Sequence, residues 1–510
     1  MVSNAKSQDK HLGDILKDIV QLADKENILI TGLALDSRKV TSGMAFLAAV
    51  GTQVDGRNYI AAALENGARA VIAEKKGNFK FPLLPGVPLI LIEDLNSQIS
   101  QIAANFFDNP SQALRVIGIT GTNGKTTCAQ LMMQLFTLLG ETGASIGTMG
   151  YGLTSETLID FGLTTPDAVA CQQYLAELRD AGATSVAMEV SSHGLTQGRV
   201  EAINFNGAMI TNITRDHLDY HASFDDYCEA KALLFKWPTL EFAVVNSDDR
   251  SCIKLAERSR SKNTYAFGLQ SRNKKTSANI LATDLSLGIS GLRAQLTTPW
   301  GEGLLESSLL GKFNLYNLLA VVAAACACGY PLLNVLDQVK KLVPAKGRLQ
   351  KVAVSNADIM VCVDYAHTPD ALDKAVQTLR AYTEGKLWVV FGCGGDRDTG
   401  KRSQMGAIAS KRADVVVVTS DNPRSESPQK IIDDILLGID YSAAQVMPMH
   451  DREAAIQYAI MQATASDVVL VAGKGHEDYQ IIGDKKLPFD DYNVCKAILK
   501  ERTRFVELAQ

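Results

Sequence analysis

The chain has 510 residues, of which 46% are hydrophobic and 21% charged, values that are usual for a globular protein of about three domains. Its formal net charge of −5 argues against a general nucleic-acid-binding protein, which needs an excess of Lys and Arg. Nine cysteines occur singly and form no CxxC pair, so we expect reduced thiols in a cytoplasmic protein, and neither disulfides nor a zinc site.

The N-terminal sequence does not have the pattern of a signal peptide, because Asp9, Asp14 and Asp18 interrupt its first apolar stretch. The longest apolar run, Leu318–Cys328, is shorter than the about 20 residues that cross a bilayer. It predicts a buried core helix. We therefore expect a chain without a membrane span.

Residues 1–110 alternate short apolar runs with polar turns, which is typical of a small α/β domain. Tyr59–Gly67 predicts a helix that ends on glycine, and Asn109-Pro110 is a suitable linker. The apolar runs that predict strands are Ile28–Leu35, Ala70–Ala73 and Pro88–Ile92.

Mainly parallel α/β domains are predicted for residues 111–345 and 346–510, which meet near Val343-Pro344. The second domain starts with a strand, a Gly-rich turn and an apolar helix, Thr126–Leu139. Its predicted strands are Arg115–Thr120, Ser185–Val190, Gly207–Asn212 and Ala243–Asn246. The third domain has predicted strands at Ile359–Asp364, Leu387–Phe391, Val415–Ser420 and Val468–Ala472.

The strongest local signal is GITGTNGKTT, Gly118–Thr127, a Gly-rich sequence between a predicted strand and a predicted helix that ends in the GK[ST] of a phosphate loop at Gly124-Lys125-Thr126. Five residues separate Gly118 from Gly124, one more than in GxxxxGK[ST]. In such a phosphate loop the glycines let backbone N–H groups approach phosphate oxygens, and the helix N-terminus adds partial positive charge. Lys125 would reach the β- and γ-phosphates, and the Thr126 hydroxyl would bind Mg²⁺. The loop predicts a nucleotide but not the reaction, because kinases, GTPases, ATPases and ligases share it.

Two further strand ends carry groups that suit a metal bound beside phosphates. Glu189 ends the strand before Val190-Ser191-Ser192-His193-Gly194, where a carboxylate is well placed to hold Mg²⁺. His217 follows another strand in the run from Thr211 to His221. A histidine in a loop is by itself more often an ordinary loop residue than a ligand, and the phosphate loop and Glu189 favour the metal interpretation here.

These motifs resemble the Mur ligase family of amide-forming enzymes, which has folylpolyglutamate synthetase as a relative. The matches, in the family's order, are GTNGKTT at Gly121–Thr127, EVSSHGL at Glu189–Leu195, TRDHLDYH at Thr214–His221, GxFNxxN at Gly311–Asn317, Gly347-Arg348, and DYAHTPD at Asp364–Asp370. Within the family, the members that add the third amino acid of the peptide are matched by Asp36-Ser37-Arg38, Val50–Gly56, Leu163–Pro166, Gly394–Arg397 and Gly473–Glu477. The resemblance covers nearly the whole chain, although residues from about 270 to 300 carry no motif.

The resemblance implies three α/β domains: a small UDP-substrate-binding domain, a central P-loop ATPase domain with a mostly parallel sheet, and a C-terminal Rossmann-like domain that binds the amino acid. It also implies an ATP-dependent ligase of peptidoglycan synthesis. The D-glutamyl carboxylate of UDP-N-acetylmuramoyl-L-alanyl-D-glutamate would attack the γ-phosphate of ATP to give an acyl phosphate. The amine of meso-diaminopimelate would then displace phosphate. Closure of the domains, with hinges near residues 110 and 345, would assemble the site.

Site residues are carried over from the family position by position. Lys125, Glu189, His217 and Lys231 are expected to be catalytic, and the metal ligands would be Thr126, Glu189, His217 and Lys231, the last as a carbamate (N6-carboxylysine). An unmodified lysine cation is a poor metal ligand, which is why the carbamate matters. The ATP-binding residues would be Gly121, Thr122, Asn123, Gly124, Lys125, Thr126, Thr127, Asn314 for adenine, Arg348 for phosphates and Asp364 for ribose.

The family match also assigns residues to the UDP substrate. The uridine diphosphate end would contact Leu35, Ser37, Thr52, Gln53 and Val54. The muramoyl-dipeptide end would contact Thr164, Thr165, Ser191, Gln197 and Arg199. Arg199 has a reason of its own, since a guanidinium pairs bidentately with a carboxylate or phosphate.

The choice of amino acid is indicated by Asp421-Asn422-Pro423-Arg424, which follows a predicted strand. In the family this DNPR sequence marks users of diaminopimelate, and lysine users lack the arginine. Meso-diaminopimelate has a second carboxylate that Arg424 could pair with, whereas lysine would leave the guanidinium unpaired. The diaminopimelate site would comprise Arg397, Asp421, Asn422, Pro423, Arg424, Gly473 and Glu477.

Three alternatives stay open at this point: a lysine-adding homologue, a folylpolyglutamate synthetase-like ligase and a non-catalytic scaffold. The Asp36-Ser37-Arg38 and DNPR motifs argue against the folate enzyme, and the presence of Lys125, Lys231 and His217 argues against a scaffold. We expect a monomer that binds small-molecule substrates, with ATP as co-substrate and Mg²⁺ as cofactor.

Overall fold

The computed structural model describes residues 9–51, 54–82, 85–155, 157–217, 220–269, 278–288 and 291–509. It divides into two compact units. The first unit comprises Met1–Asp284, Ala294–Leu305 and Tyr316–Lys341, and the second comprises Leu285–Arg293, Glu306–Leu315 and Leu342–Gln510. The three main sheets confirm the expected α/β class.

The N-terminal sheet has four parallel strands that are covered on both faces. Its strands are β3 (Leu33–Ala34), β4 (Ala45–Ala48), β5 (Ala70–Glu74) and β6 (Leu89–Ile92). Alternate side chains of β5 point to opposite faces, so Ala70 and Ile72 pack with helices α1 (Leu12–Ile15) and α3 (Leu95–Phe106). Val71 and Ala73 pack with α2 (Ile60–Glu65) on the other face.

The single strand predicted at Ile28–Leu35 is wrong, because the chain changes partners at Thr31-Gly32. Before this point β2 (Leu29–Ile30) pairs with β1 (Lys10–His11) in a separate two-stranded sheet. At this point the N–H of Thr31 donates to Gly43 and the carbonyl of Gly32 accepts from Ala45. Beyond it, β3 pairs with β4.

The central sheet has ten strands, and those from β8 through β10, β7, β11, β12 and β13 to β14 pair in parallel. In spatial order the strands are β16 (Gly301–Ser307), β15 (Gly291–Thr298), β14 (Ile280–Gly288), β13 (Asn263–Leu269), β12 (Phe242–Asn246), β11 (Gly207–Ile210), β7 (Arg115–Thr120), β10 (Ser185–Glu189), β8 (Gly143–Gly147) and β9 (Gly150–Gly152). The helices are α4 (Lys125–Leu138), α5 (Ala168–Asp180), α6 (Ser192–Thr196), α7 (Phe224–Ala232), α8 (Arg250–Ala256), α9 (Lys312–Ala327) and α10 (Leu332–Val339).

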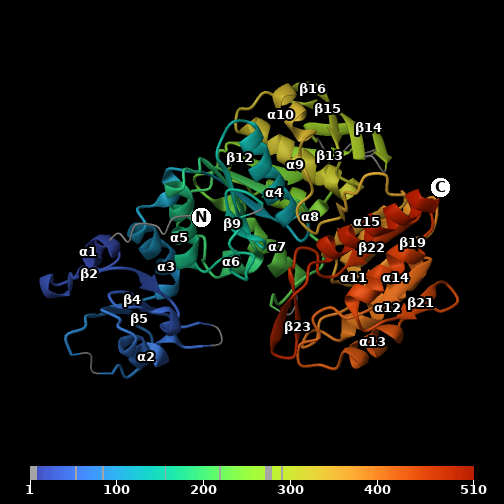
Figure 1. Ribbon diagram of the computed structural model, residues 1–510. Helices are drawn as coiled ribbons and strands as arrows, with labels where there is room; N and C mark the ends of the chain where they lie inside the picture. The colour runs from blue at the N-terminus through green and yellow to red at the C-terminus, as the bar shows by residue number, and fades with distance from the viewer. Residues whose placement is uncertain are drawn as a thin grey trace. The chain divides into compact units, whose positions relative to one another are not determined.

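Helix α4 packs on β8 and β10 and thereby carries the residues of the phosphate loop onto the sheet (Figure 1). The apolar run at Leu318–Cys328 lies largely in α9, where Leu318 and Val321 are fully buried, as expected of a core helix. Strands β14 and β15 lie in the region from about 270 to 300 that carried no motif, and β13 and β16 lie on either side of it. The sequence pattern did not predict these four strands.

The C-terminal sheet shows why its strands are continuous apolar runs. Its order is β17 (Gln350–Lys351), β18 (Met360–Asp364), β22 (Val468–Ala472), β19 (Leu387–Phe391), β20 (Val415–Val418) and β21 (Gln445–Pro448). In β20, Val416 and Val418 pack on one core cluster while Val415 and Val417 pack on the other. Both faces are covered, so polar residues have no place in the strand.

Helices of the second unit cover the two faces of this sheet (Figure 1). One face carries α11 (Pro369–Arg380), α12 (Gly400–Arg412) and α13 (Pro428–Leu436), and the other carries α14 (Arg452–Gln462) and α15 (Asp491–Ala509). A two-stranded hairpin, β23 (Tyr479–Ile482) with β24 (Lys485–Pro488), precedes α15. The two units do not divide the chain near residue 110, and the domain boundaries expected near residues 110 and 345 stay predictions.

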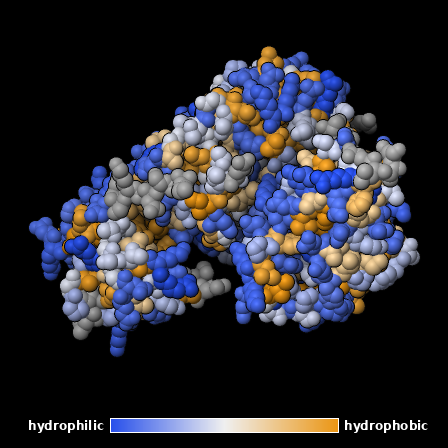
Figure 2. Space-filling view, viewed as in Figure 1, coloured by the Kyte–Doolittle hydropathy of each residue, from blue (hydrophilic) through white to orange (hydrophobic). Residues whose placement is uncertain are grey.

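Hydrophobic and hydrophilic residues are mixed on the face of the molecule seen in Figure 2. Figure 2 shows hydrophobic residues in small separate groups among hydrophilic ones on the face in view. Among the helices of the described ranges, none has the length and apolarity needed to cross a membrane.

Candidate active site

The phosphate loop lies where the carboxyl ends of β7, β10 and β11 meet. The register pairs Ile119 with Glu189 and Thr120 with Ile210, so the segments after all three strands start at one edge of the sheet. Gly121 has a φ of 139°, and a Cβ there would lie 2.1 Å from the Thr211 hydroxyl oxygen. Only glycine fits this backbone conformation and this close approach.

The loop is held by the segment that follows β11. The backbone N–H of Asn123 donates to the side-chain oxygen of Asn212 (3.0 Å), whose amide nitrogen donates to the Asn123 carbonyl (3.0 Å). The hydroxyl of Thr122 donates to the Thr214 carbonyl at 3.1 Å. These contacts fix the loop before any phosphate arrives.

Lys125, Thr126 and Glu189 form the centre of the site. The ammonium of Lys125 donates to the carbonyls of Gly121 (2.9 Å) and Thr122 (3.0 Å), which holds its charge over the loop. The hydroxyl of Thr126 donates to Glu189 Oε2 at 3.0 Å. Glu189 is 1% exposed, so its carboxylate belongs to the interior of the site.

A second residue, Thr148, holds Glu189 from the turn between β8 and β9. Its N–H donates to Oε1 (2.9 Å) and its hydroxyl to Oε2 (3.2 Å) of that carboxylate. The Thr126 hydroxyl and the Glu189 carboxylate are hard oxygen donors, which is the chemistry that Mg²⁺ prefers.

Lys231 is a buried cation of the same region. It is 1% exposed, its ammonium donates to the Gly121 carbonyl at 3.0 Å, and it lies 4.4 Å from the centre of the Tyr227 ring. Burial, and next the nearby charge of Lys125, lower the pKa of Lys231 well below its ordinary value. Burial at this position therefore disfavours the charged form of Lys231 relative to that of an exposed lysine.

His217 lies in an aromatic group at the edge of the site, and its side chain is 45% exposed. Its ring centre is 5.1 Å from that of His193 and 6.2 Å from that of Tyr227. In the described part of the chain, no three His, Cys, Asp or Glu side chains come together as a metal site. The metal ligands expected from the family are not of these four residue types alone, because they include the hydroxyl of Thr126 and a modified lysine, Lys231.

A cavity of about 1000 Å³ in the first unit gathers residues expected to bind the UDP substrate. Of these residues, Leu35, Ser37, Val54, Gln197 and Arg199 line it. Thr52 and Gln53 lie outside the described residues. Other lining side chains with polar groups were not predicted as site residues, among them Tyr59, Asn96, Ser97 and Tyr220.

Thr164, Thr165 and Ser191 do not line this cavity; they connect it to Glu189. The Arg199 guanidinium donates to the Thr165 carbonyl at 2.7 Å. The Thr165 hydroxyl donates to the backbone carbonyl of Glu189 (3.0 Å) and accepts from the N–H of Ser191 (2.9 Å). The hydroxyls of Thr164 and Thr148 are hydrogen-bonded at 3.1 Å.

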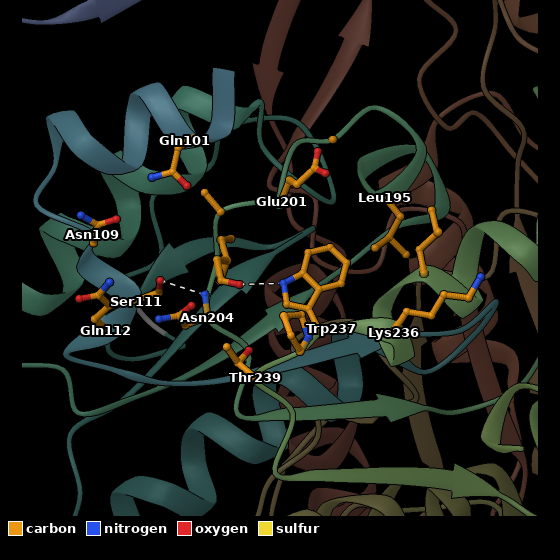
Figure 3. A pocket seen from close by; sticks show the side chains of 15 residues that line it. Gln101, Asn109, Ser111, Gln112, Leu195, Glu201, Asn204, Lys236, Trp237 and Thr239 are labelled. Atoms are coloured by element: carbon orange, nitrogen blue, oxygen red, sulfur yellow. Dashed lines mark hydrogen bonds between the residues drawn. The ribbon is translucent and has the colours of Figure 1, made fainter. Parts of the chain in front are cut away.

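A second cavity, of about 580 Å³, shares Gly198 and Glu201 with the first (Figure 3). The indole N–H of Trp237 donates to the Ile203 carbonyl at 2.8 Å, and the N–H of Asn204 donates to the Ser111 hydroxyl at 3.0 Å. These lining groups therefore bond to one another. None of the site residues expected from the sequence lines this cavity.

The second unit holds the residues expected to bind adenosine. The Arg348 guanidinium lies 4.7 Å from the centre of the Tyr365 ring. The Asp364 carboxylate accepts from the N–H groups of Leu349 (2.6 Å) and Ala366 (2.9 Å), so it holds the turn that carries Arg348. Burial raises the pKa of Asp364. Asn314 is buried, and its amide donates to the Leu310 carbonyl at 2.8 Å.

Gly347, next to Arg348, packs directly against the loop after β22. A Cβ at Gly347 would lie 2.1 Å from the carbonyl carbon of Gly475 and 2.3 Å from the nitrogen of His476. Its φ of 67° is also unfavourable for other residues. Glycine at this position therefore brings two predicted binding segments together.

The loops that carry Arg397 and Arg424 are joined along their lengths. The N–H of Gly395 donates to the Asn422 carbonyl (2.9 Å), and the Arg424 guanidinium donates to the Gly395 carbonyl (2.7 Å). The Ser425 hydroxyl donates to Asp396 at 2.7 Å. Arg397, at the end of the first loop, is exposed.

A fully buried arginine, Arg402, supports both loops from α12. It pairs with Glu426 (2.8 Å) and Asp434 (2.9 Å), and it donates to the Gly394 carbonyl at 3.3 Å. Hydrogen bonding from Arg402 holds the pKa of Glu426 at about 2. Glu426 also accepts from the N–H of Asp396, which completes the connection.

The remaining predicted residues of this site lie around Asn422. Its amide nitrogen donates to Glu477 at 2.8 Å. The carbonyl of Asp421 accepts from Gln480 of β23 at 2.7 Å, and a Cβ at Gly473 would lie 2.6 Å from the Asp421 carboxylate. The structure thus brings together Asp421, Asn422, Gly473 and Glu477.

Comparison with known proteins identifies the family. The Mur ligase family catalytic domain matches residues 29–134, the Mur ligase middle domain matches residues 119–325, and the Mur ligase glutamate ligase domain matches residues 347–475. A UDP-N-acetylmuramoyl-L-alanyl-D-glutamate--2,6-diaminopimelate ligase of Ectopseudomonas mendocina is 47% identical over 92% of this chain and 95% of its own. The chain belongs to the Mur ligase family.

Other Mur ligases agree over the full length. A ligase of the same name from Coxiella burnetii is 44% identical over 95% of this chain and 99% of its own. A solved structure of a UDP-N-acetylmuramoyl-L-alanyl-D-glutamate--2,6-diaminopimelate ligase has a TM-score of 0.69 at 36% identity, covering 97% of this chain and 99% of that one. These matches confirm the resemblance drawn from the motifs.

Sequence reasoning missed several residues of this Mur ligase that hold others in place. The Gly-Thr-Met-Gly turn after an apolar run could have suggested Thr148 as a site residue. Nothing in the neighbouring sequence indicates that it contacts Glu189. Tyr220 lies inside a matched motif and could have been included. Arg402 gives no local signal, because its partners are 24 and 32 residues away.

Proposed function

We propose that this Mur ligase uses ATP to join meso-diaminopimelate to the D-glutamyl carboxylate of UDP-N-acetylmuramoyl-L-alanyl-D-glutamate, through an acyl phosphate, in bacterial peptidoglycan synthesis. The observation that carries the proposal is the hydrogen bonding that joins the loop of Arg397 to the loop of Arg424 at Asn422, whose amide also donates to Glu477. The high identity to relatives of that name supports the same substrates.

Activation of the carboxylate is the task of the first unit. A carboxylate is a poor electrophile, and its attack on a phosphate brings two anions together. Lys125 lies over the phosphate loop and offsets this repulsion, while the backbone N–H groups of the loop bind the phosphates. The cavity lined by Ser37, Gln197 and Arg199 holds the UDP substrate on the same unit.

Mg²⁺ fits the oxygen donors of Thr126 and Glu189, with His217 and the carbamate of Lys231 as ligands of a second ion. When bound, the metal neutralises charge on the phosphates that react. Thr148 holds the Glu189 carboxylate through both of its oxygens. Asn314, Arg348 and Asp364 bind the adenine, phosphates and ribose of ATP. The reaction uses ATP, so we place the protein in the cytoplasm, and we expect a monomer.

The burial of Lys231 supports its conversion to a carbamate. Only the uncharged amine attacks CO₂, and the burial that lowers the pKa of Lys231 favours that form. The product is anionic, so it can bind a cation that an ammonium would repel.

Replacing Lys231 with methionine is expected to lower phosphate release about 100-fold, because the carbamate that would hold a metal ion beside the phosphates cannot form. Wild-type enzyme in buffer free of CO₂ and bicarbonate should lose activity and regain it when bicarbonate is added. Lys236→Met, five residues away, is the control and should retain activity. Full activity of Lys231→Met, or no response to bicarbonate, would contradict the carbamate.

Arg424 is the residue proposed to distinguish diaminopimelate from lysine. Its guanidinium donates to Gly395 at 2.7 Å, and the backbone of Arg424 pairs with β23, so its position is fixed. A guanidinium held in this way can pair bidentately with the second carboxylate of diaminopimelate. Lysine lacks that carboxylate and would leave the charge unpaired.

Phosphate release from ATP, measured with the UDP substrate and either meso-diaminopimelate or L-lysine, tests the proposal. Strong turnover is expected only with diaminopimelate. Arg424→Ala should lower kcat/KM for it about 100-fold, which corresponds to about 3 kcal/mol. Arg412→Ala, on an exposed part of α12, should have no effect. Turnover with lysine would support the ligase activity but refute the role of Arg424 in specificity. No turnover with either amino acid would refute the proposed function.

A further inference from the structure

Lys474 is a fully buried cation in the loop between β22 and β23, and the proposed reaction gives it no role. Its side chain is 0% exposed, and its ammonium donates to Asn422 Oδ1 (3.1 Å) and to Glu477 Oε2 (3.0 Å). It also lies 5.5 Å from the centre of the Tyr479 ring. A buried charge persists only when it is paired in this way.

The contacts of Lys474 fix the orientation of the Asn422 amide. Oδ1 of Asn422 accepts from the Lys474 ammonium and from the backbone N–H of Ile481 (2.9 Å), and both of these groups can only donate. The other end of the amide must therefore be the NH₂ group, which donates to Glu477 Oε2 at 2.8 Å. If the Asn422 amide were rotated by 180°, its NH₂ group would face these two donors. Without Lys474, only the Ile481 N–H would oppose that rotation.

The same contacts orient the Glu477 carboxylate. Its Oε2 accepts from both Lys474 and Asn422, which fixes the plane of the carboxylate and the direction of Oε1. The side chain of Glu477 is 18% exposed, whereas that of Lys474 is 0% exposed. A ligand can therefore reach the carboxylate while the cation behind it stays covered.

We propose that Lys474 is a positioning residue that sets amino-acid specificity. It holds Asn422 and Glu477 in the orientation that binds the second amino-acid centre of the incoming substrate, which is the centre that carries the second carboxylate. This inference rests on the proposed function. Lys474 acts through its two partners and does not touch the substrate. Glu477 accepts from the ammonium of that centre, next to the carboxylate that Arg424 binds.

Lys474→Met removes the charge at nearly constant volume. We expect it to raise KM for meso-diaminopimelate about 10- to 100-fold, because the oriented charge-assisted hydrogen bonds are lost. KM for ATP and for the UDP substrate should stay within about twofold, since neither binds these residues. The matched control is Lys486→Met: the Lys486 ammonium lies 3.8 Å from the centre of the same Tyr479 ring but on exposed β24. It should leave all three KM values unchanged.

The comparison with Glu477→Gln separates positioning from a purely structural role. If Lys474 acts through Glu477, then Lys474→Met should raise KM for diaminopimelate much less in the Glu477→Gln background than in the wild type. Lys474→Gln, which keeps an N–H donor, provides the same test if the methionine variant does not fold. It should give an intermediate KM.

Three results would overturn the inference: an unchanged KM for diaminopimelate, an equal rise of KM for all substrates, or the same effect in both backgrounds. If the wild type uses diaminopimelate normally, these results leave the proposed function intact. A wild-type enzyme that does not use diaminopimelate would overturn the inference and the proposed function together.

Discussion

Lys125→Met will lower the rate of phosphate release about 1000-fold or more when all substrates are saturating. The reason is electrostatic: the attacking carboxylate and the γ-phosphate are both anionic, and Lys125 is the cation that the phosphate loop holds over them. KM for the UDP substrate should change little, because Lys125 does not line the cavity assigned to that substrate. A coupled assay for phosphate, with each substrate varied in turn, measures both quantities.

The control for this experiment is Lys254→Met, which removes an exposed lysine from α8 and should keep wild-type activity. Binding of ADP to Lys125→Met, followed by calorimetry, shows whether the loop is still formed. A variant that binds ADP and keeps more than a tenth of the wild-type rate would refute the assigned role.

The largest effect on stability is expected from Arg452→Leu. Arg452 and Asp491 are both 0% exposed and form a bidentate pair with distances of 2.7 and 2.6 Å. Arg452 also donates to the carbonyls of Ser420 (3.2 Å) and Ala472 (3.0 Å), just after β20 and at the end of β22. Loss of the arginine leaves a buried carboxylate without its cation, which costs about 3–5 kcal/mol.

Urea unfolding followed by tryptophan fluorescence measures this loss of stability for the second unit, which contains Arg452. Trp388 lies in β19, so its signal can be isolated by replacing Trp237 and Trp300 with phenylalanine. The double variant Arg452→Leu/Asp491→Leu should recover much of the lost stability, because the charge is removed together with its partner. Arg412→Leu, which breaks the exposed pair with Asp373, should shift the midpoint little. A small shift for Arg452→Leu alone would contradict the argument.

Much of the fold was predictable where a single stretch of chain determines the structure. The runs Arg115–Thr120, Leu387–Phe391 and Val468–Ala472 are strands with the predicted bounds, because strands buried on both faces are apolar along most of their length. The phosphate loop was predictable for a similar reason: its glycines and Lys125 act within ten residues.

What escaped prediction depends on contacts between distant segments. The break at Thr31-Gly32 arises from the N–H of Thr31, which bonds to Gly43. Strand β14 is half exposed along much of its length and has no continuous apolar run. Arginine and lysine usually lie at the surface, so the sequence does not indicate that Arg402 and Lys474 are buried. Only the folded chain shows that each is buried against acidic partners. The roles of the site residues stay predictions, because they concern molecules that must bind to this arrangement.

The order of strands has a consequence for the growing chain on the ribosome. In the central sheet, β7 is made first and lies between β10 and β11, so later strands add to the sides of one already present. In the C-terminal sheet, β22 lies between β18 and β19 but is made after β19, β20 and β21. Until residue 472 has been synthesised, β18 and β19 lack the strand that joins them, and their apolar edges stay open to other chains. Translation that stops before this point leaves the last domain unable to close its sheet.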